Sequence, residues 1–150
     1  MGELEVRGPW VAGAYFPGNE AADRWTEDGW FRTGDIVTIG PSGCITIQDR
    51  AKDLVKSGGE WISSVELEGA IAAHAAVHEA AVVAVPDPKW GERPLALVVA
   101  HAELEQSDLA GFLEGRVARW WIPERLELVD EIPKTSVGKY DKRRIRQEYA

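Results

Sequence analysis

The chain has 150 residues, of which 45% are hydrophobic and 28% are charged, and its formal net charge is −8. This length and composition predict one globular domain or two small ones, and they exclude a disordered chain, which would contain far fewer apolar residues. The longest apolar runs, Ala80–Val85 and Leu95–Ala100, are much shorter than the ~18 residues of a membrane-spanning helix. The charged first residues also lack the apolar stretch of a signal peptide. We therefore expect a cytoplasmic protein without a transmembrane segment.

The charges are unevenly distributed along the chain. Residues 1–49 carry three basic and eight acidic residues, and residues 50–132 carry eight basic and fifteen acidic residues. Residues 133–150 reverse the sign, with six basic and two acidic residues. An acidic body argues against nucleic-acid binding, because phosphate contacts need a basic face. The single Cys44 excludes an intrachain disulfide and a multi-cysteine zinc site, and the three histidines do not supply a metal site.

The first third of the sequence is rich in turn signals, among them those at residues 7–9, 16–19 and 40–43. The apolar stretches Ile36–Ile39 and Cys44–Gln48 flank the last of these turns and predict a β-hairpin. We interpret residues 1–49 as mostly β structure. A segment of this kind, without a long amphipathic helix, has difficulty closing a core by itself.

The pattern changes near residue 50. Leu54–Ser57 and Glu60–Ser63 predict a second hairpin whose turn is Gly58-Gly59, and Ser63 with Glu66 has the capping-box spacing that begins a helix. The elements expected after it are buried strands at Ala80–Val85 and Leu95–His101, a helix from Ser107 or Asp108 to Trp120, a strand at Arg125–Val129, a loop at Pro133–Gly138 and a helix at Asp141–Tyr149. This succession predicts a small α+β domain over residues 50–150, with a three-stranded sheet, a β-hairpin and helices.

Three clusters of residues are candidates for chemistry. Asp35 follows a glycine at the start of a strand and can accept hydrogen bonds from two hydroxyls, as a ribose diol requires, although a turn-capping role alone explains it better. Residues 49–60 place charged side chains beside the bare Gly58-Gly59 turn, where a ligand can approach the backbone closely. Residues 133–139 form a loop of small residues that presents Lys139. That loop is not a phosphate-binding Walker motif, because Tyr140 stands where serine or threonine is required.

Together, in this order and spacing, the clusters resemble the C-terminal part of an adenylate-forming enzyme. This superfamily includes acyl-CoA synthetases, nonribosomal adenylation domains and firefly luciferase. The resembling segments cover essentially the whole chain; they are Gly29-Trp30-Phe31-Arg32-Thr33-Gly34-Asp35, Asp49-Arg50-x-Lys52-Asp53-x-x-Lys56-x-Gly58-Gly59-Glu60, Glu68-x3-Ala72-x-His74, Pro86-Asp87-Pro88-x-x-Gly91-Glu92 and Pro133-Lys134-Thr135-x-x-Gly138-Lys139. Residues 57–63 and 120–123 further resemble the branch of medium-chain fatty-acyl and methylthiopropionyl-CoA ligases.

The resemblance implies a reaction in two steps. A carboxylic acid attacks the α-phosphate of ATP, held with Mg²⁺, to give an acyl-adenylate and pyrophosphate. The thiol of coenzyme A then displaces AMP to give the thioester, after the C-terminal domain has rotated on the N-terminal one. ATP and coenzyme A are thus expected as substrates, and no cofactor is expected to be tightly bound.

The resemblance also assigns roles to individual residues. Lys139 is expected to be the catalytic lysine of adenylate formation, and Asp35 to bind the ribose hydroxyls with help from Arg50. Lys52 matches the hinge of the rotation. The turn Gly58-Gly59-Glu60 is expected to line the channel for the pantetheine arm of coenzyme A, with Lys56 as an electrostatic helper. Lys134, Lys142 and Arg143 are expected to be solvated charges, and the tryptophans to pack in the core and between domains rather than to stack on ligands.

The family places its pyrophosphate loop, adenine-binding stretch and acyl pocket before the segment that begins at Gly29, and none of them is present here. We therefore expect a fragment in which residues 1–49 end the large domain and residues 50–150 form the mobile lid. Its partner is then the missing large domain; alone it is inactive or nearly so, and the acyl substrate is not specified. One alternative is a stand-alone, non-enzymatic module that binds a partner protein or a nucleotide, and another is an adenylation domain that serves a carrier protein. A fragment is expected to show an exposed apolar face on residues 1–49, and a stand-alone module is not.

Overall fold

The computed structural model describes residues 1–15 and 22–149, and the chain divides into two units, Met1–Lys52 and Asp53–Ala150. The division lies three residues beyond the boundary expected after Asp49. The reason is that a strand of the first unit continues to Arg50, and the Ala51 N–H donates to the Gly34 carbonyl at 2.8 Å. The turn expected at residues 16–19 lies outside the described residues.

The first unit contains a three-stranded antiparallel sheet in the order β1-β2-β3. Its strands are β1 (Gly2–Val6), β2 (Phe31–Ile39) and β3 (Ile45–Arg50), and a short 3₁₀ helix covers Ala22–Arg24. The hairpin predicted from the apolar stretches around residues 40–43 is confirmed by β2 and β3. β1 extends the sheet with a strand that the sequence analysis does not single out.

The apolar residues of the first unit are only partly covered. Among its described residues only Ile36, Val37 and the carboxylate-bearing Asp49 are buried. In contrast, Ile39, Ile45 and Ile47 are 67%, 51% and 65% exposed, and Ile45 lies directly opposite Ile39 in the ladder between β2 and β3. The exposed apolar face expected of a fragment is therefore present on this hairpin.

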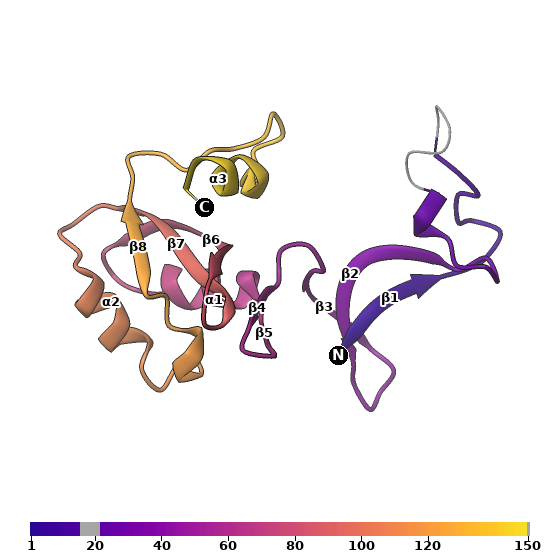
Figure 1. Ribbon diagram of the computed structural model, residues 1–150, viewed down its shortest axis with the longest axis horizontal. Coiled ribbons are helices and arrows are strands. Elements are labelled where there is room, and N and C mark those ends of the chain that lie inside the picture. Colours follow the sequence, from indigo (N-terminus) through magenta and orange to yellow (C-terminus); the bar gives the residue numbers. More distant parts are fainter. Residues whose placement is uncertain (16–21, 150) are drawn as a thin grey trace. The chain divides into compact units, whose positions relative to one another are not determined.

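The second unit is built on a five-stranded sheet with three α-helices (Figure 1). Its elements are β4 (Val55–Ser57), β5 (Glu60–Ile62), α1 (Ser64–Ala72), β6 (Val77–Asp87), β7 (Gly91–Ala100), α2 (Gln106–Leu113), β8 (Arg125–Leu128) and α3 (Lys142–Tyr149). Strands β5-β4-β7-β6 follow one another across the sheet as antiparallel neighbours, and β8 pairs parallel to β7. The three predicted strands and the predicted hairpin thus belong to one sheet, joined where Ser57 pairs with Gly91.

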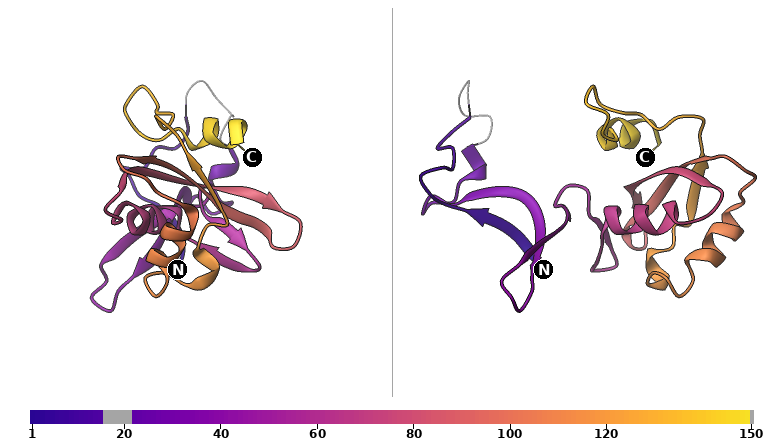
Figure 2. Two further views of the ribbon diagram at one scale, coloured as in Figure 1. Left: turned by 90° about the vertical axis from the view of Figure 1, so that its left-hand side faces the viewer. Right: turned by 180° about the vertical axis from the view of Figure 1, so that it is seen from behind.

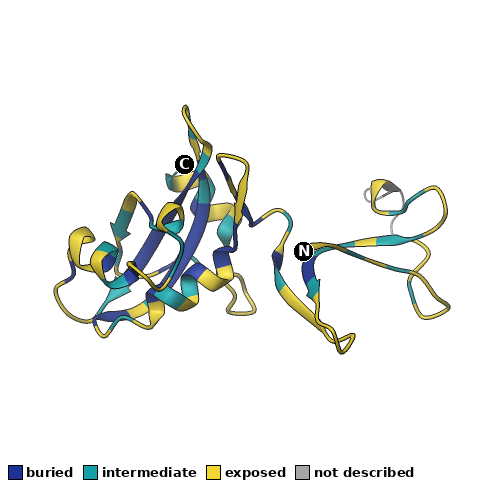
Figure 3. Cartoon of the chain, turned by 90° about the horizontal axis from the view of Figure 1, so that it is seen from below, coloured by how far each residue is buried: buried dark blue, intermediate teal, exposed yellow. Residues whose placement is uncertain are grey.

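Alternation along β6 and β7 divides the core of this unit into two layers. Ala80, Val82, Ala96 and Val98 face α1 and α2, whereas Ala81, Val83, Val85, Leu95 and Leu97 face Ile132 and Ile145 of the segment that ends in α3. Figures 1 and 2 show α3 on one face of the sheet and the other two helices on the opposite face, and Figure 3 shows the buried residues concentrated in the central strands. No helix within the described residues is long and apolar enough to span a bilayer.

Local signals explain how two of the helices begin and end. The Ser63 hydroxyl accepts a hydrogen bond from the Glu66 N–H at 3.1 Å and begins α1, as the capping spacing predicts. The predicted extension of α2 to Trp120 is wrong. The helix ends at Leu113 because Gly115 adopts a positive φ of 75°, and Arg119–Trp121 form a separate 3₁₀ turn.

Candidate active site

Asp35 and Arg50 form a cross-strand pair in the first unit. They are partners in the register of β2 and β3, and Arg50 Nη1 lies 2.9 Å from Asp35 Oδ1. Gly34, just before Asp35, has a φ of +76°, which turns the strand there. The Asp35 side chain is 23% exposed, and because a carboxylate has two oxygens, its Oδ2 can still accept hydrogen bonds from a ligand. The structure thus brings together the two residues expected to bind ribose.

The glycine turn lies in the second unit, between β4 and β5. Gly58 and Gly59 both have a positive φ, 60° and 87°, which the two-residue hairpin requires. Gly58 is also in close contact with Trp90: a Cβ at Gly58 would lie 2.9 Å from the indole, and the Gly58 N–H donates to the Trp90 carbonyl at 2.8 Å. Gly58 is therefore required both by the turn and by its neighbour.

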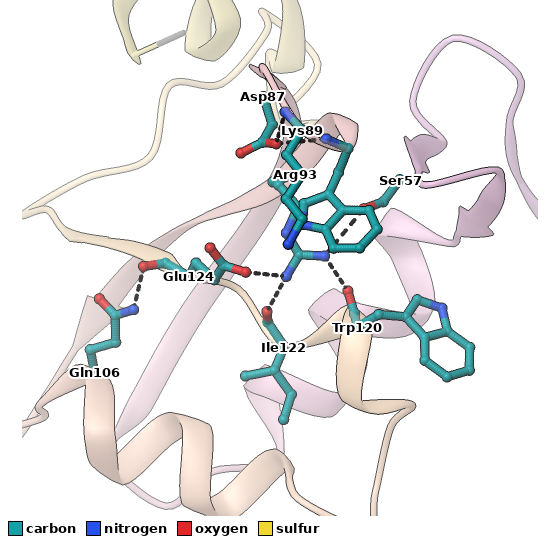
Figure 4. Close-up of polar contacts among 9 residues, drawn as sticks. Ser57, Asp87, Lys89, Arg93, Gln106, Trp120, Ile122 and Glu124 are labelled. Carbon is teal, nitrogen blue, oxygen red and sulfur yellow. Dashed lines mark hydrogen bonds and ion pairs between the residues drawn. The ribbon is translucent and has the colours of Figure 1, made fainter.

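Arg93 lies beside this turn and joins three segments of the unit through hydrogen bonds (Figure 4). It is only 9% exposed, and Nη1 donates to the Trp120 carbonyl at 2.7 Å and to Ser57 Oγ at 3.2 Å. Nη2 donates to the Ile122 carbonyl at 3.3 Å and to Glu124 Oε1 at 2.9 Å. One guanidinium therefore connects β4, β7 and the 3₁₀ turn at residues 119–121.

A cleft of about 350 Å³ opens beside the turn, within the 300–1,000 Å³ range of small-molecule sites. Its lining combines the bare turn with two indoles and two guanidinium groups; it consists of Ser57, Gly58, Glu60, Trp90, Arg93, Arg119, Trp120 and Glu124. Trp90 and Trp120 are 43% and 49% exposed. These two tryptophans, and also Trp10 and Trp61, therefore do not pack in the core. The other part of the prediction, packing between domains, stays a prediction.

Lys139 lies on a narrow hairpin loop between β8 and α3. The Thr135 N–H donates to the Lys139 carbonyl at 2.8 Å, the Gly138 N–H donates back to the Thr135 carbonyl at 2.9 Å, and a β-bridge joins Lys134 to Tyr140. We call residues 134–140 the lysine hairpin. Lys139 itself is exposed and makes no ion pair with another described residue. Its ammonium is available to an anionic ligand.

Two ion pairs lie next to the lysine hairpin. Lys134 Nζ lies 2.7 Å from Glu79 Oε1, and the hydrogen bond to Glu79 raises the pKa of Lys134 above its ordinary value. Lys142 Nζ lies 2.7 Å from Glu68 Oε1, and both side chains are largely buried. The expectation of a solvated charge is therefore wrong for Lys142, whereas Lys134 is exposed although it is ion-paired.

The other expected site residues occupy different parts of the chain. Lys52 is exposed and is the last residue of the first unit. Lys56 is exposed on β4, and its backbone N–H donates to Glu92 Oε2 at 2.7 Å. Glu60 begins β5 and lines the cleft. Figures 1 and 2 show the β4–β5 turn and the loop before α3 at opposite ends of the second unit.

No pattern in the sequence pointed to Arg93, Arg119 or the pair of Glu68 and Lys142 as site residues. Arg93 follows directly on the Gly91-Glu92 motif and precedes the apolar run of β7, which is the signal that could have indicated a buried, bonded cation. The partners of Lys142 are distant in sequence, and Ser64, for example, precedes it by 78 residues. No local pattern could have indicated that pairing.

Comparison with known proteins identifies similar sequences over the whole chain. Residues 66–139 match the model of the AMP-binding enzyme C-terminal domain. The chain is 50% identical over 153 residues to a long-chain-fatty-acid–CoA ligase of Thermus thermophilus, with 99% of this chain and 28% of the relative covered. It is 48% identical over 152 residues to a 3-methylmercaptopropionyl-CoA ligase of Ruegeria lacuscaerulensis, with the same shares covered. The chain thus spans less than a third of the length of these curated relatives.

Solved structures are also similar to this chain over nearly its whole length. ATP-bound MatB from Rhodopseudomonas palustris matches with a TM-score of 0.89 and 34% identity, covering 99% of this chain and 30% of that one. The o-succinylbenzoate CoA synthetase of Bacillus subtilis, in complex with its acyl-adenylate intermediate, matches with a TM-score of 0.88 and 33% identity. That match covers 97% of this chain and 30% of that one.

Proposed function

Because the chain belongs to the adenylate-forming superfamily and contains its AMP-binding enzyme C-terminal domain, we propose that it serves an AMP-forming acyl-CoA ligase. In this reaction a carboxylate oxygen attacks the α-phosphate of Mg²⁺-bound ATP, and pyrophosphate leaves. The coenzyme A thiol, having lost its proton, then attacks the acyl carbon, and AMP leaves. We call these steps the adenylation and the thioester half-reactions.

One observation carries this proposal: the second unit presents two chemically different features at opposite ends. One is the exposed ammonium of Lys139 on its hairpin, and the other is the bare Gly58-Gly59 turn beside the cleft. A cation suits the meeting of a carboxylate with a phosphate, where negative charge must be stabilised. A turn without side chains suits the approach of a narrow thiol arm. The Lys139 end of the unit therefore suits the adenylation half-reaction, and the glycine-turn end suits the thioester half-reaction.

Residues in both units are proposed to bind the nucleotides of the two half-reactions. Asp35, held by Arg50, is proposed to accept hydrogen bonds from the ribose hydroxyls of ATP and AMP. In the cleft, the exposed indoles of Trp90 and Trp120 offer flat surfaces to the adenine of coenzyme A, and the exposed Arg119 offers a charge to its phosphates. Lys56 supplies further positive charge on β4, and Lys52 is proposed as the hinge between the two units.

The two alternative functions are less well supported. A stand-alone binding module has no reason to expose Ile39, Ile45 and Ile47 together, whereas a chain that is covered by a large domain does. A carrier protein would deliver the same pantetheine arm to the glycine turn. The additional indoles of the cleft and the exposed guanidinium of Arg119 favour coenzyme A, which has a nucleotide for them to bind.

The test is a chimera in which this chain replaces the matching segment of the Thermus thermophilus ligase. We expect the chimera to release pyrophosphate from ATP in the presence of a fatty acid, and this chain alone to release none above background. Lys139→Ala in the chimera should slow adenylation by about 10²–10³-fold, as removal of a preorganised cationic group does, and leave thioester formation from supplied acyl-adenylate unchanged. Arg144→Ala is the control, because Arg144 forms an exposed pair with Glu148.

Two results would contradict the proposal. Equal loss of both half-reactions in Lys139→Ala would remove the role assigned to Lys139. Acid-dependent pyrophosphate release by this chain alone, abolished by Lys139→Ala, would show that no large domain is required.

A further inference from the structure

The lysine hairpin has little support of its own. Residues 135–139 are all exposed, and the hydrogen bonds described for this segment are internal to the hairpin. The direction in which Lys139 points is therefore set at the two ends of the hairpin. One end holds Lys134, paired with Glu79 on β6, and the other end continues through Asp141 into α3.

A buried polar junction holds the first turn of α3 against α1. Lys142 Nζ lies 2.7 Å from Glu68 Oε1 and 2.6 Å from Ser64 Oγ, both on α1. The same Glu68 oxygen accepts the N–H of Val82 on β6 at 2.8 Å. The side chains of Lys142 and Glu68 are only 13% and 15% exposed. The Glu68 carboxylate thus connects α1, β6 and α3. Its contact on α3, Lys142, is only three residues after Lys139 in the sequence.

The remaining charges of α3 do not duplicate this junction. Arg144 pairs with Glu148 within the helix, and both side chains are exposed. Arg146 pairs with Asp53 at 2.6 Å, one turn farther from the hairpin. Ile145, which is fully buried, holds the same face of the helix against the sheet but carries no directional bond. Lys142 is the ion-paired residue of α3 that lies nearest to the lysine hairpin.

We propose that Lys142, held by Glu68 and Ser64, is a positioning residue that sets the direction of the lysine hairpin and thereby of the Lys139 ammonium. This inference rests on the proposed function of Lys139 and adds the residues that hold it. A buried ion pair whose partner is removed leaves an uncompensated charge, so the junction fixes α3 far more firmly than an exposed pair does. The glycine turn at the other end of the unit has no contact with this junction among those described.

The first test measures amide hydrogen exchange of this chain and needs no activity. Lys142→Met should speed exchange at residues 134–140 by at least about tenfold, because a buried pair is broken at the base of the hairpin. Arg144→Met, the matched control on the same helix, should leave it unchanged, and Lys142→Arg should retain most of the protection. Unchanged exchange at residues 134–140 in Lys142→Met would overturn the proposal.

A second variant covers the case in which Lys142→Met destabilises the whole unit, shown by faster exchange in β6 and β7. Ser64→Ala removes a single acceptor from the Lys142 ammonium and leaves the Glu68 pair intact. It should speed exchange selectively at residues 134–140, by a smaller factor than Lys142→Met. Exchange at these residues equal to that of the unsubstituted chain would overturn the proposal.

The second test uses the chimera and separates positioning from mere stability. Lys142→Met should slow adenylation and spare thioester formation from supplied acyl-adenylate, because only adenylation uses Lys139. Equal loss of both half-reactions, or no loss of adenylation, would overturn the positioning role. If Lys139→Ala itself affects both half-reactions alike, the proposed function has failed instead, and the exchange experiment still decides whether Lys142 orders the hairpin.

Discussion

Arg50 Nη1 lies 2.9 Å from Asp35 Oδ1, and the two residues are direct partners across β2 and β3. The guanidinium therefore orients the carboxylate while one of its oxygens stays available. An ionised acceptor is what two ribose hydroxyls need, because hydrogen bonds to a charged group are stronger than those between neutral groups. This pair is the part of the proposed nucleotide site that the first unit contributes.

Asp35→Asn should weaken nucleotide binding without unfolding the chain. Loss of hydrogen bonds to a charged carboxylate should raise the KM for ATP of the chimera by about 10- to 100-fold. The ion pair with Arg50 is partly exposed, so the free energy of unfolding should fall by less than about 1 kcal/mol. Steady-state kinetics and urea denaturation measure the two effects.

Glu5→Gln is the control for Asp35→Asn, because Glu5 forms an exposed ion pair with Arg32 in the same sheet. It should change neither the KM for ATP nor the stability appreciably. An unchanged KM in Asp35→Asn would contradict the assignment of Asp35 to the ribose.

Gly58→Ala should damage the turn through two effects that Gly59→Ala separates. Both glycines have a positive φ, but only at Gly58 would a Cβ clash with Trp90, while nothing lies within 4 Å of a Cβ at Gly59. Gly58→Ala should therefore reduce the free energy of unfolding by about 1–3 kcal/mol more than Gly59→Ala does. Its thioester half-reaction should slow, because Trp90, which lines the cleft, must move.

The double variant Gly58→Ala with Trp90→Ala checks the cause of this difference. Removal of the indole should abolish the extra cost of the alanine at position 58, which a double-mutant cycle of unfolding free energies measures. Additive effects would show that the clash with Trp90 is not the reason.

Arg93→Met should destabilise the second unit. The substitution leaves the Trp120 and Ile122 carbonyls and Ser57 Oγ without their buried donor, which should reduce the free energy of unfolding by about 2–4 kcal/mol. Glu124 contributes little to this loss, because its side chain is 70% exposed. Arg144→Met is the control in chemical denaturation, and a loss no larger than in that control would contradict the role of Arg93.

The stability of the second unit should decline in strong alkali. Burial raises the pKa of Tyr140, and the hydrogen bond to Glu79 raises the pKa of Lys134. A group whose pKa is higher in the folded state contributes stability below its unfolded pKa and loses it as the pH rises through the folded value. Unfolding should therefore become easier above about pH 10, where both groups titrate in the unfolded chain.

Tyr140→Phe removes the contribution of the phenol to this pH dependence. Thermal melts at a series of pH values should show a shallower decline for the variant than for the unsubstituted chain. A decline of the same slope would show that Tyr140 is not one of the responsible groups.

The sequence predicted those features that depend on neighbouring residues. The Gly58-Gly59 turn, the cap formed by Ser63 and the hairpin of β2 and β3 are all encoded within a few residues, and the structure confirms them. The end of α2 was missed because the apolar pattern continues past Leu113 and only the conformation of Gly115 interrupts it. Some expectations stay predictions. They are the cytoplasmic location, the absence of nucleic-acid binding and the roles of the site residues, which are Lys139, Asp35, Arg50, Lys52, Lys56 and the glycine turn.

Features that join distant segments could not be predicted. The burial of Lys142 depends on Glu68 and Ser64, and that of Arg93 depends on carbonyls of a 3₁₀ turn that no periodicity indicates. Charged residues are rarely buried, so a basic helix is reasonably interpreted as solvated until its acceptors are located. The tertiary contacts override that expectation here.

The ion pair between Arg146 and Asp53 joins residues 93 positions apart, so α3 connects the beginning of the second unit to its end. A contact of such sequence separation requires a long loop to be closed, which costs conformational entropy until the intervening elements have packed. We therefore expect the terminal helix to dock late in folding, once Asp53 and the acceptors Ser64 and Glu68 on α1 are in place. A partly folded unit should therefore expose Lys139 without a fixed direction, and the proposed catalytic cation should become correctly oriented only once the whole unit has folded.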